Sequence, residues 1–166
     1  MNPEERQNAG VDNRPSVQSL PMFHRILKAT PETVRDALGA VRARFREEVG
    51  EDTLGRLELV LAEVMNNIAE HAGDHVAPGQ MVRPPLVHLW VVGHDGGLAC
   101  ALSDDGASLP AECLLPRDLP QIGSEDLPEG GFGWYLIQDL TQELCYYREG
   151  RRNFLAFRIP PGGVAE

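Results

Sequence analysis

Residues 63–71 read EVMNNIAEH and carry Glu63, Asn67 and His71 at intervals of four. Because a helix turns by about 100° per residue, steps of four align these side chains in one polar stripe. A neighbouring stripe of the same helix is apolar and consists of Leu57, Leu61, Val64 and Ile68. A carboxylate, an amide and an imidazole beside a buried face are costly without partners. The segment therefore indicates either a binding site or an ordinary solvated helix edge.

The composition limits the classes of partner. A length of 166 residues predicts one domain, large enough to bury a core without disulfides. The chain has 15 Lys and Arg against 25 Asp and Glu, a formal net charge of −10. Because so acidic a surface repels phosphate backbones and anionic lipid, we expect no direct binding to nucleic acid or to membranes.

The cysteines indicate the compartment. Cys100, Cys113 and Cys145 lie far apart, are odd in number and form no CxxC pair. This pattern indicates a reducing compartment. It argues against a disulfide framework and against a cysteine-based zinc site. The N-terminal segment MNPEERQNAG has no hydrophobic signal region, and the longest apolar run is short. We therefore expect a cytoplasmic protein.

Capping and helix-breaking residues define the first elements. Residues 1–20 are polar and predict a disordered tail. A strand is expected at 22–28. The first helix has Thr30 as its N-cap, Pro31 at its first position and Gly50 as its stop.

The remainder of the chain alternates between helical and hairpin patterns. A second helix is expected at 53–72, and a hairpin that turns at HDGG is expected within 85–106. Residues 107–129 contain four prolines and predict a long functional loop, which could act as a lid. A third helix is expected at 133–141, and a final hairpin that turns at Glu149–Gly150 completes the chain.

This order of elements predicts an α+β fold. It fits a two-layer α/β sandwich in which the helices cover one face of a mixed, mainly antiparallel sheet. The expected domain spans residues 21–162.

Three polar clusters fall on this scaffold: the helix stripe, DDGAS at the end of a strand (104–108), and EGGFG before a helix (129–133). Taken alone, DDG is often a turn and GGFG is often a hinge. Glycines before a helix, however, allow backbone N–H groups to approach an anion at the positive end of the helix dipole. A P-loop is excluded because Lys28 is the only lysine and follows no GxxxxGK pattern, and the dinucleotide fingerprint lacks its third glycine.

In order and spacing, the three clusters resemble the GHKL, or Bergerat, superfamily of ATP-binding domains. The most similar branch is that of the anti-sigma-factor serine/threonine kinases, which consist of this domain alone. The family's first box has Glu, Asn and His at intervals of four, and it matches Glu63, Asn67 and His71. The resemblance covers residues 22–160.

The other two boxes follow in the same order. The DxGxG box matches Asp104 and Gly106, with Ser108 where the family has a second glycine. The GxG box that opens a helix matches Gly131 and Gly133. Three ordered motifs with a loop between the last two are far more specific than any one of them.

The resemblance implies roles for the helix stripe and the loop. Asn67 would coordinate a Mg²⁺ ion that bridges the phosphates of ATP or ADP. Glu63 would accept the proton of an attacking hydroxyl or water. His71 would orient the site or pack beneath the lid. Arg117, the only basic residue of the 107–129 loop, would stabilise charge on the transferring phosphoryl group.

It also implies roles for the two glycine-containing boxes. Asp104 would accept a hydrogen bond from the exocyclic amine of adenine, and Gly106 would leave room for the ring. Gly131, Phe132 and Gly133 would hold the phosphates at the helix N-terminus, and the loop would close over them as a lid.

The function implied is that of an ATP-dependent serine/threonine protein kinase in partner switching. Its partners would be a small anti-anti-sigma-like (STAS-type) substrate and a sigma factor, and we expect a homodimer. One alternative is a partner-binding module in which the nucleotide only sets the conformation. Another is a metal site at His71 and His75 beside Glu70, although Gly73 interrupts the helix between the two histidines.

Overall fold

The computed structural model describes residues 22–73, 76–108 and 132–162. Several predicted features lie outside these ranges, namely the 1–20 tail, residues 109–129 of the loop, His75, Arg117 and Gly131. The described elements, in chain order, are β1 (Phe23–Lys28), α1 (Pro31–Phe45), α2 (Glu51–Glu70), a short 3₁₀ helix (His71–Gly73), β2 (Leu86–His94), β3 (Gly97–Asp104), α3 (Phe132–Leu140), β4 (Gln142–Glu149) and β5 (Arg152–Ile159).

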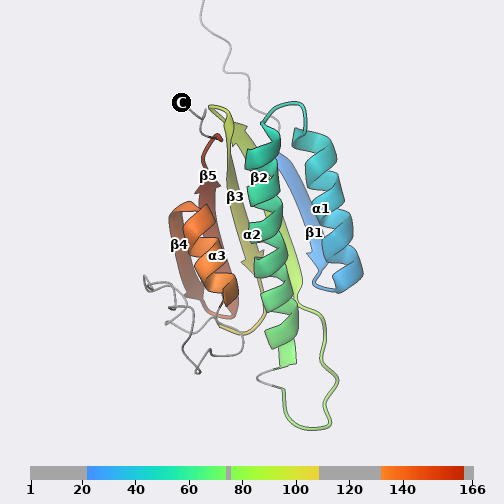
Figure 1. The fold of residues 1–166 in the computed structure, drawn as a ribbon. Helices are drawn as coiled ribbons and strands as arrows, with labels where there is room; N and C mark the ends of the chain where they lie inside the picture. Colours follow the sequence, from blue (N-terminus) through green and yellow to red (C-terminus); the bar gives the residue numbers. More distant parts are fainter. Residues whose placement is uncertain (1–21, 74–75, 109–131, 163–166) are drawn as a thin grey trace, which may run out of the picture.

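The strands form one sheet in the order β1-β2-β3-β5-β4. The three helices lie together on one of its faces (Figure 1). The predicted α+β fold with two layers is thus confirmed. The sheet was expected to be mixed and mainly antiparallel, and each of the four pairings among the described strands is antiparallel.

The first helix begins as predicted and ends earlier. The Thr33 amide donates to Thr30 Oγ1 at 3.3 Å, and the Thr30 amide donates back to Thr33 Oγ1 at 3.1 Å, which completes a reciprocal cap. The helix ends at Phe45 rather than at Gly50, because the chain turns to bury Val49 against the core. Gly50 is instead the extended residue that precedes α2.

The hairpin between β2 and β3 turns where the sequence predicts. Asp95 has φ of 50° and Gly96 has φ of 78°, so both central residues lie in the left-handed region. Such turns match the twist of antiparallel strands, and they favour Asp-Gly and Asn-Gly pairs. The turn therefore fixes the register in which Leu102 and Asp104 reach the end of β3.

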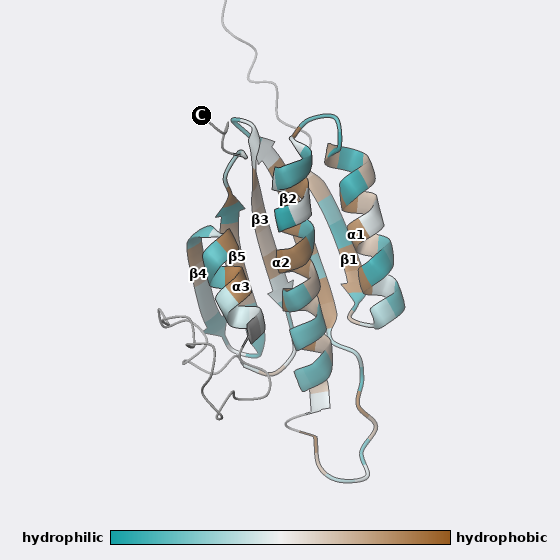
Figure 2. Cartoon of the chain, in the orientation of Figure 1, coloured by the Kyte–Doolittle hydropathy of each residue, from teal (hydrophilic) through white to brown (hydrophobic). Residues whose placement is uncertain are grey.

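The core lies between the sheet and the helices. Alternate strand residues face the helices, and buried side chains of α2 meet them, including Leu54, Leu57, Leu61 and Met65. Hydrophilic residues follow the outward side of α1 and α2, shown in teal in Figure 2. No helix in the described ranges is long and apolar enough to cross a bilayer.

The packing of α2 gives a direct test of this core. Leu57 is fully buried, whereas Leu59 on the same helix is 53% exposed. Leu57→Ala should lower the free energy of unfolding by about 2–5 kcal/mol, because it removes buried methyl groups and leaves a cavity. Leu59→Ala is the matched control and should change it by less than about 0.5 kcal/mol. Urea denaturation measures both, and equal effects would contradict the orientation of α2.

Candidate functional site

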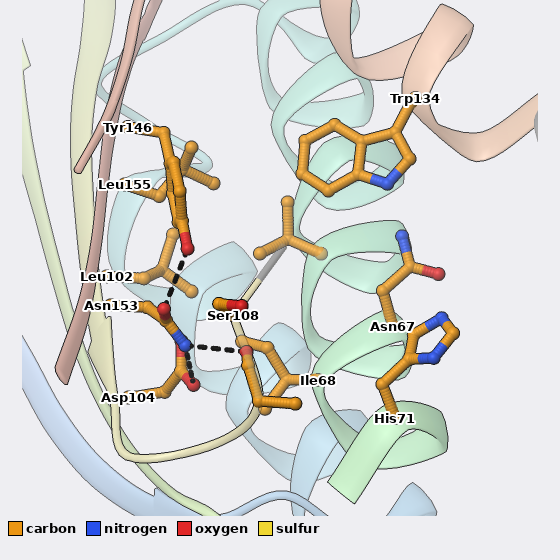
Figure 3. A pocket seen from close by; sticks show the side chains of 12 residues that line it. Asn67, Ile68, His71, Leu102, Asp104, Ser108, Trp134, Tyr146, Asn153 and Leu155 are labelled. Carbon is orange, nitrogen blue, oxygen red and sulfur yellow. Dashed lines mark hydrogen bonds between the residues drawn. The ribbon is translucent and has the colours of Figure 1, made fainter. Parts of the chain in front are cut away.

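Several elements converge at one end of the domain. Figure 1 places the C-terminal part of α2, the end of β3, the start of β5 and the beginning of α3 at this end. A pocket of about 110 Å³ lies between α2 and the sheet there. Its lining residues are Val64, Asn67, Ile68, His71, Leu102, Asp104, Ala107, Ser108, Trp134, Tyr146, Asn153 and Leu155 (Figure 3).

Asp104 supplies the negative charge of this pocket. It occupies the inward position that follows Leu98, Cys100 and Leu102 along β3, and it is only 6% exposed. Its Oδ1 accepts from the Gly106 amide at 2.8 Å and from Asn153 Nδ2 at 3.0 Å. Burial raises the pKa of the Asp104 carboxyl, while the bond from Asn153 opposes that shift.

The second carboxylate oxygen of Asp104 has a different environment. Both hydrogen bonds end on Oδ1, and among the described residues Oδ2 has no donor. Since Asp104 lines the pocket, Oδ2 is an acceptor available to a ligand with an N–H group.

Asn153 orients Asp104 and belongs to a network of its own. It lies directly opposite Asp104 in the β3–β5 register. Asn153 Nδ2 also donates to the Ala107 carbonyl at 2.9 Å, while Asn153 Oδ1 accepts from the Tyr146 hydroxyl at 2.7 Å and from Arg148 Nη1 at 2.8 Å. These bonds, several of which are drawn in Figure 3, fix which end of the amide faces Asp104. Asn153 therefore holds the carboxylate in one orientation.

The loop after Asp104 approaches its side chain closely. A Cβ atom on Gly106 would lie 2.9 Å from Asp104 Oδ1 and 3.4 Å from Pro85 Cγ. Any other residue at position 106 would push against the carboxylate, so glycine keeps the backbone N–H in hydrogen-bonding distance.

The polar stripe of α2 divides between the pocket and the first turn of α3. Asn67 and His71 line the pocket, with His71 in the short 3₁₀ helix rather than in α2. Glu63 lies instead against α3, where a Cβ atom on Gly133 would come within 2.5 Å of Glu63 Oε2 and 3.7 Å of Asn67 Nδ2. Glycine at position 133 thus allows Glu63 and Asn67 to approach the beginning of α3.

The other walls of the pocket are apolar. Leu102 and Leu155 from the sheet face Ile68 from α2, and the Trp134 indole lies at the α3 end (Figure 3). Val64 of α2 also lines the pocket. A slot with apolar walls and one buried acceptor suits a flat, partly polar ring.

Most of the predicted site residues therefore come together. Asn67, His71 and Asp104 share one pocket, Gly106 contacts Asp104, and Glu63 lies beside Gly133. Phe132 is the first residue of α3, whereas Arg117 and Gly131 lie outside the described residues. Asn66, the neighbour of Asn67 in α2, is exposed.

Five residues that line the pocket were not predicted from the sequence: Leu102, Trp134, Tyr146, Asn153 and Leu155. One of them carried a detectable signal. Leu155, Phe157 and Ile159 are alternate residues of the last strand and share its buried face. Asn153 continues this series, so the sequence places a polar side chain on the buried face. A polar residue in a buried strand position needs a partner and so indicates a site or a network.

Comparisons with known proteins identify the family. The model of the histidine kinase-like ATPase domain matches residues 27–159, which is most of the chain. The chain therefore belongs to this family, and the predicted relation to the GHKL ATP-binding domains is confirmed. Membership in an ATPase-domain family implies nucleotide binding. No curated protein sequence matches the chain.

One solved structure shares the fold of this chain. The RsbU and RsbW domains of Rv1364c from Mycobacterium tuberculosis match with a TM-score of 0.54 and 15% sequence identity. The match covers 87% of this chain and 35% of that chain, so this chain spans roughly a third of the larger protein. The catalytic domain of the histidine kinase ThkA, in a nucleotide-free form, matches 84% of this chain and 97% of its own with a TM-score of 0.43 and 12% identity.

The buried carboxylate predicts a particular pH dependence. In an unfolded chain the carboxyl group of Asp has a pKa of about 4. Because the pKa of folded Asp104 is raised, the stability that Asp104 contributes is present at low pH and is lost as pH rises through the folded pKa. Asp104→Asn removes the ionisable group and with it this pH-dependent loss of stability. The amide oxygen of the new side chain can still accept from Gly106 and Asn153.

The free energy of unfolding of the Asp104→Asn variant, minus that of the wild type, should therefore increase between about pH 4 and pH 7. Urea denaturation of both proteins across this range measures the difference. A difference that is constant, or that decreases with pH, would contradict the raised pKa.

Proposed function

We propose that this member of the histidine kinase-like ATPase family binds ATP with adenine in the slot and the phosphates near the first turn of α3. The observation that carries the proposal is the buried Asp104 carboxylate, which keeps Oδ2 without a donor among the described residues. The exocyclic amine of adenine supplies the N–H donor that this oxygen lacks. The apolar side chains on both sides of the slot suit the faces of a purine ring.

The α2–α3 junction has the features that phosphates require. The first backbone N–H groups of a helix have no partner within the helix and lie at the positive end of its dipole, and α3 presents this end here. Asn67 lies beside this turn, and its amide oxygen would be a ligand of a Mg²⁺ ion bound there, while Glu63 lies next to Gly133. The described residues include no cluster of three His, Cys, Asp or Glu side chains that could hold a metal. A Mg²⁺ ion at Asn67 would therefore take its other ligands from phosphate oxygens and water.

The reaction proposed is phosphoryl transfer to a serine or threonine hydroxyl of a partner protein. Glu63 accepts the hydroxyl proton, the hydroxyl oxygen forms a bond to the γ-phosphorus, and the bond to the leaving oxygen of ADP breaks. Arg117 from the loop would balance charge on the transferred group. The partner is proposed to be an anti-anti-sigma-like, STAS-type protein in a switch that includes a sigma factor, with this chain as a homodimer in the cytoplasm.

Two observations support this assignment to partner switching. The three motifs match the anti-sigma-factor kinase branch in order and spacing. One structure that shares the fold contains RsbU and RsbW domains.

A second candidate function is nucleotide-dependent partner binding without phosphoryl transfer. It is favoured by Glu129, which stands just before the GxG box where kinases of this branch carry a basic residue. A negative charge at this position would oppose the γ-phosphate rather than stabilise it.

The role of Asn67 can be tested by binding alone. Asn67→Ala removes the proposed Mg²⁺ ligand, so the tightening of ATP binding by Mg²⁺ should be lost. Calorimetric titration with ATP, with and without Mg²⁺, measures this effect. The matched control is Asn66→Ala, which alters an exposed amide on the same helix and should titrate like wild type. Mg²⁺ dependence that survives in Asn67→Ala would remove Asn67 from the cation site.

Glu63 distinguishes the two candidate functions. Glu63→Gln keeps the shape of the side chain and removes the base, so transfer from labelled ATP to a STAS-type substrate should decrease by about 10²-fold or more while ADP affinity is unchanged. Arg117→Ala should have a similar effect. Glu70→Gln, at an exposed position of α2, is the control. A wild type that transfers no phosphate but binds its partner only with nucleotide would favour the second function.

A further inference from the structure

A second groove lies on the other side of the loop that follows Asp104. It has a volume of about 410 Å³ and is formed by the segment after α2, the loop after β3 and the turn between β4 and β5. Its lining includes Val76, Arg83, Pro84, Pro85, Arg148 and Arg151. We call it the arginine groove.

The arginine groove is positively charged in an acidic protein. Arg83, Arg148 and Arg151 against Asp105 give +3 and −1, or +2, whereas the whole chain carries −10. Asp105 Oδ1 accepts from the Leu86 amide at 2.8 Å, which holds that carboxylate against the backbone. Within the described part of the chain, Arg83 and Arg151 are exposed and form no ion pair. Three guanidinium groups against one carboxylate give the groove an excess of positive charge, which attracts an anion.

Arg148 lines the arginine groove and connects it to the nucleotide pocket through Asn153, which lines that pocket. Its Nη1 donates to the Gly106 carbonyl at 3.0 Å and to Asn153 Oδ1 at 2.8 Å. Gly106 and Asn153 are also the two donors to Asp104. The remaining N–H groups of Arg148 have no acceptor among the described residues. An anion bound to these N–H groups would fix the position of the Arg148 guanidinium. It would thereby also fix Gly106 and Asn153, which donate to Asp104.

We propose that the arginine groove binds an acidic segment of a partner protein, and that docking tightens nucleotide binding through Arg148. The second part rests on the proposed function. Val76, Pro84 and Pro85 give the groove apolar walls beside its charges, which suits aliphatic side chains interspersed with carboxylates. An inorganic anion would leave these apolar walls uncovered.

The docking site is tested with a short fluorescein-labelled peptide of mixed glutamate and leucine, followed by fluorescence anisotropy on the full chain. The peptide should bind the wild type, and more weakly as salt rises. Arg83→Glu combined with Arg151→Glu places like charges opposite the peptide, so affinity should fall by about tenfold or more. These two residues lie outside the nucleotide pocket, so nucleotide affinity without peptide should be unchanged.

The control pair is Arg35→Glu with Arg46→Glu, which makes the same change in net charge at exposed positions on and just after α1. An equal loss of peptide affinity in this control would show that only total charge matters and would overturn the proposal. Equal binding of a peptide with glutamine for glutamate would also overturn it. Tighter competition by inorganic phosphate or by a single-stranded oligonucleotide would reject an acidic peptide as the occupant.

Coupling is read from ADP titrations with and without saturating peptide. Wild type should bind ADP severalfold more tightly with peptide, and ADP should tighten peptide binding by the same factor because linkage is reciprocal. The Arg83→Glu, Arg151→Glu protein should lack this effect. Peptide binding with unchanged ADP affinity would overturn the coupling. A wild type that binds no nucleotide would reject the proposed function, while the anisotropy assay would still test the docking site.

Discussion

The site depends on one buried carboxylate and the amide that orients it. Asp104 and Asn153 occupy opposite positions of β3 and β5, and both side chains face the helices. A buried carboxylate with no partner would cost several kcal/mol, so the two strands gain stability only in the register that aligns this pair. The same constraint determines the chemistry of the pocket. Asn153 and the Gly106 amide satisfy Oδ1, which leaves Oδ2 as the acceptor that faces the slot.

The helices contribute the other half of the site, which consists of Glu63 and Asn67 on α2 and the first turn of α3. Close approach of the two helices brings these groups together. Gly133 lets the first turn of α3 approach α2 so closely that Glu63 Oε2 occupies the space of a Cβ atom. Leu57 and Leu61 hold the neighbouring side of α2 in the core, which directs the stripe of Glu63 and Asn67 toward that turn. In the proposed complex the sheet would recognise the adenine ring, and the α2–α3 junction would receive the phosphates.

The parts of this arrangement that depend on local spacing were predictable from the sequence. The interval of four in EVMNNIAEH placed Glu63 and Asn67 on one side of α2, and the Asp-Gly pair placed the hairpin that ends at Asp104. Asn153 reaches Asp104 only through the pairing of β3 with β5, 49 residues apart, and no local pattern encodes a partner at that distance. The end of α1 was misjudged for a similar reason, because burial of Val49 decides it.

The network around Asp104 also limits how strongly two surfaces can influence each other. Arg148 contacts Asp104 only through Gly106 and Asn153, and a hydrogen bond to a charged group contributes about 1.5–3 kcal/mol. Arg148 has two states, with and without an acidic segment bound in the arginine groove. Docking can change nucleotide affinity only by the difference in this hydrogen-bond energy between the two states. Coupling between sites is typically about 1–3 kcal/mol, so this single side chain is sufficient to account for it. No movement of the sheet or of α2 is needed.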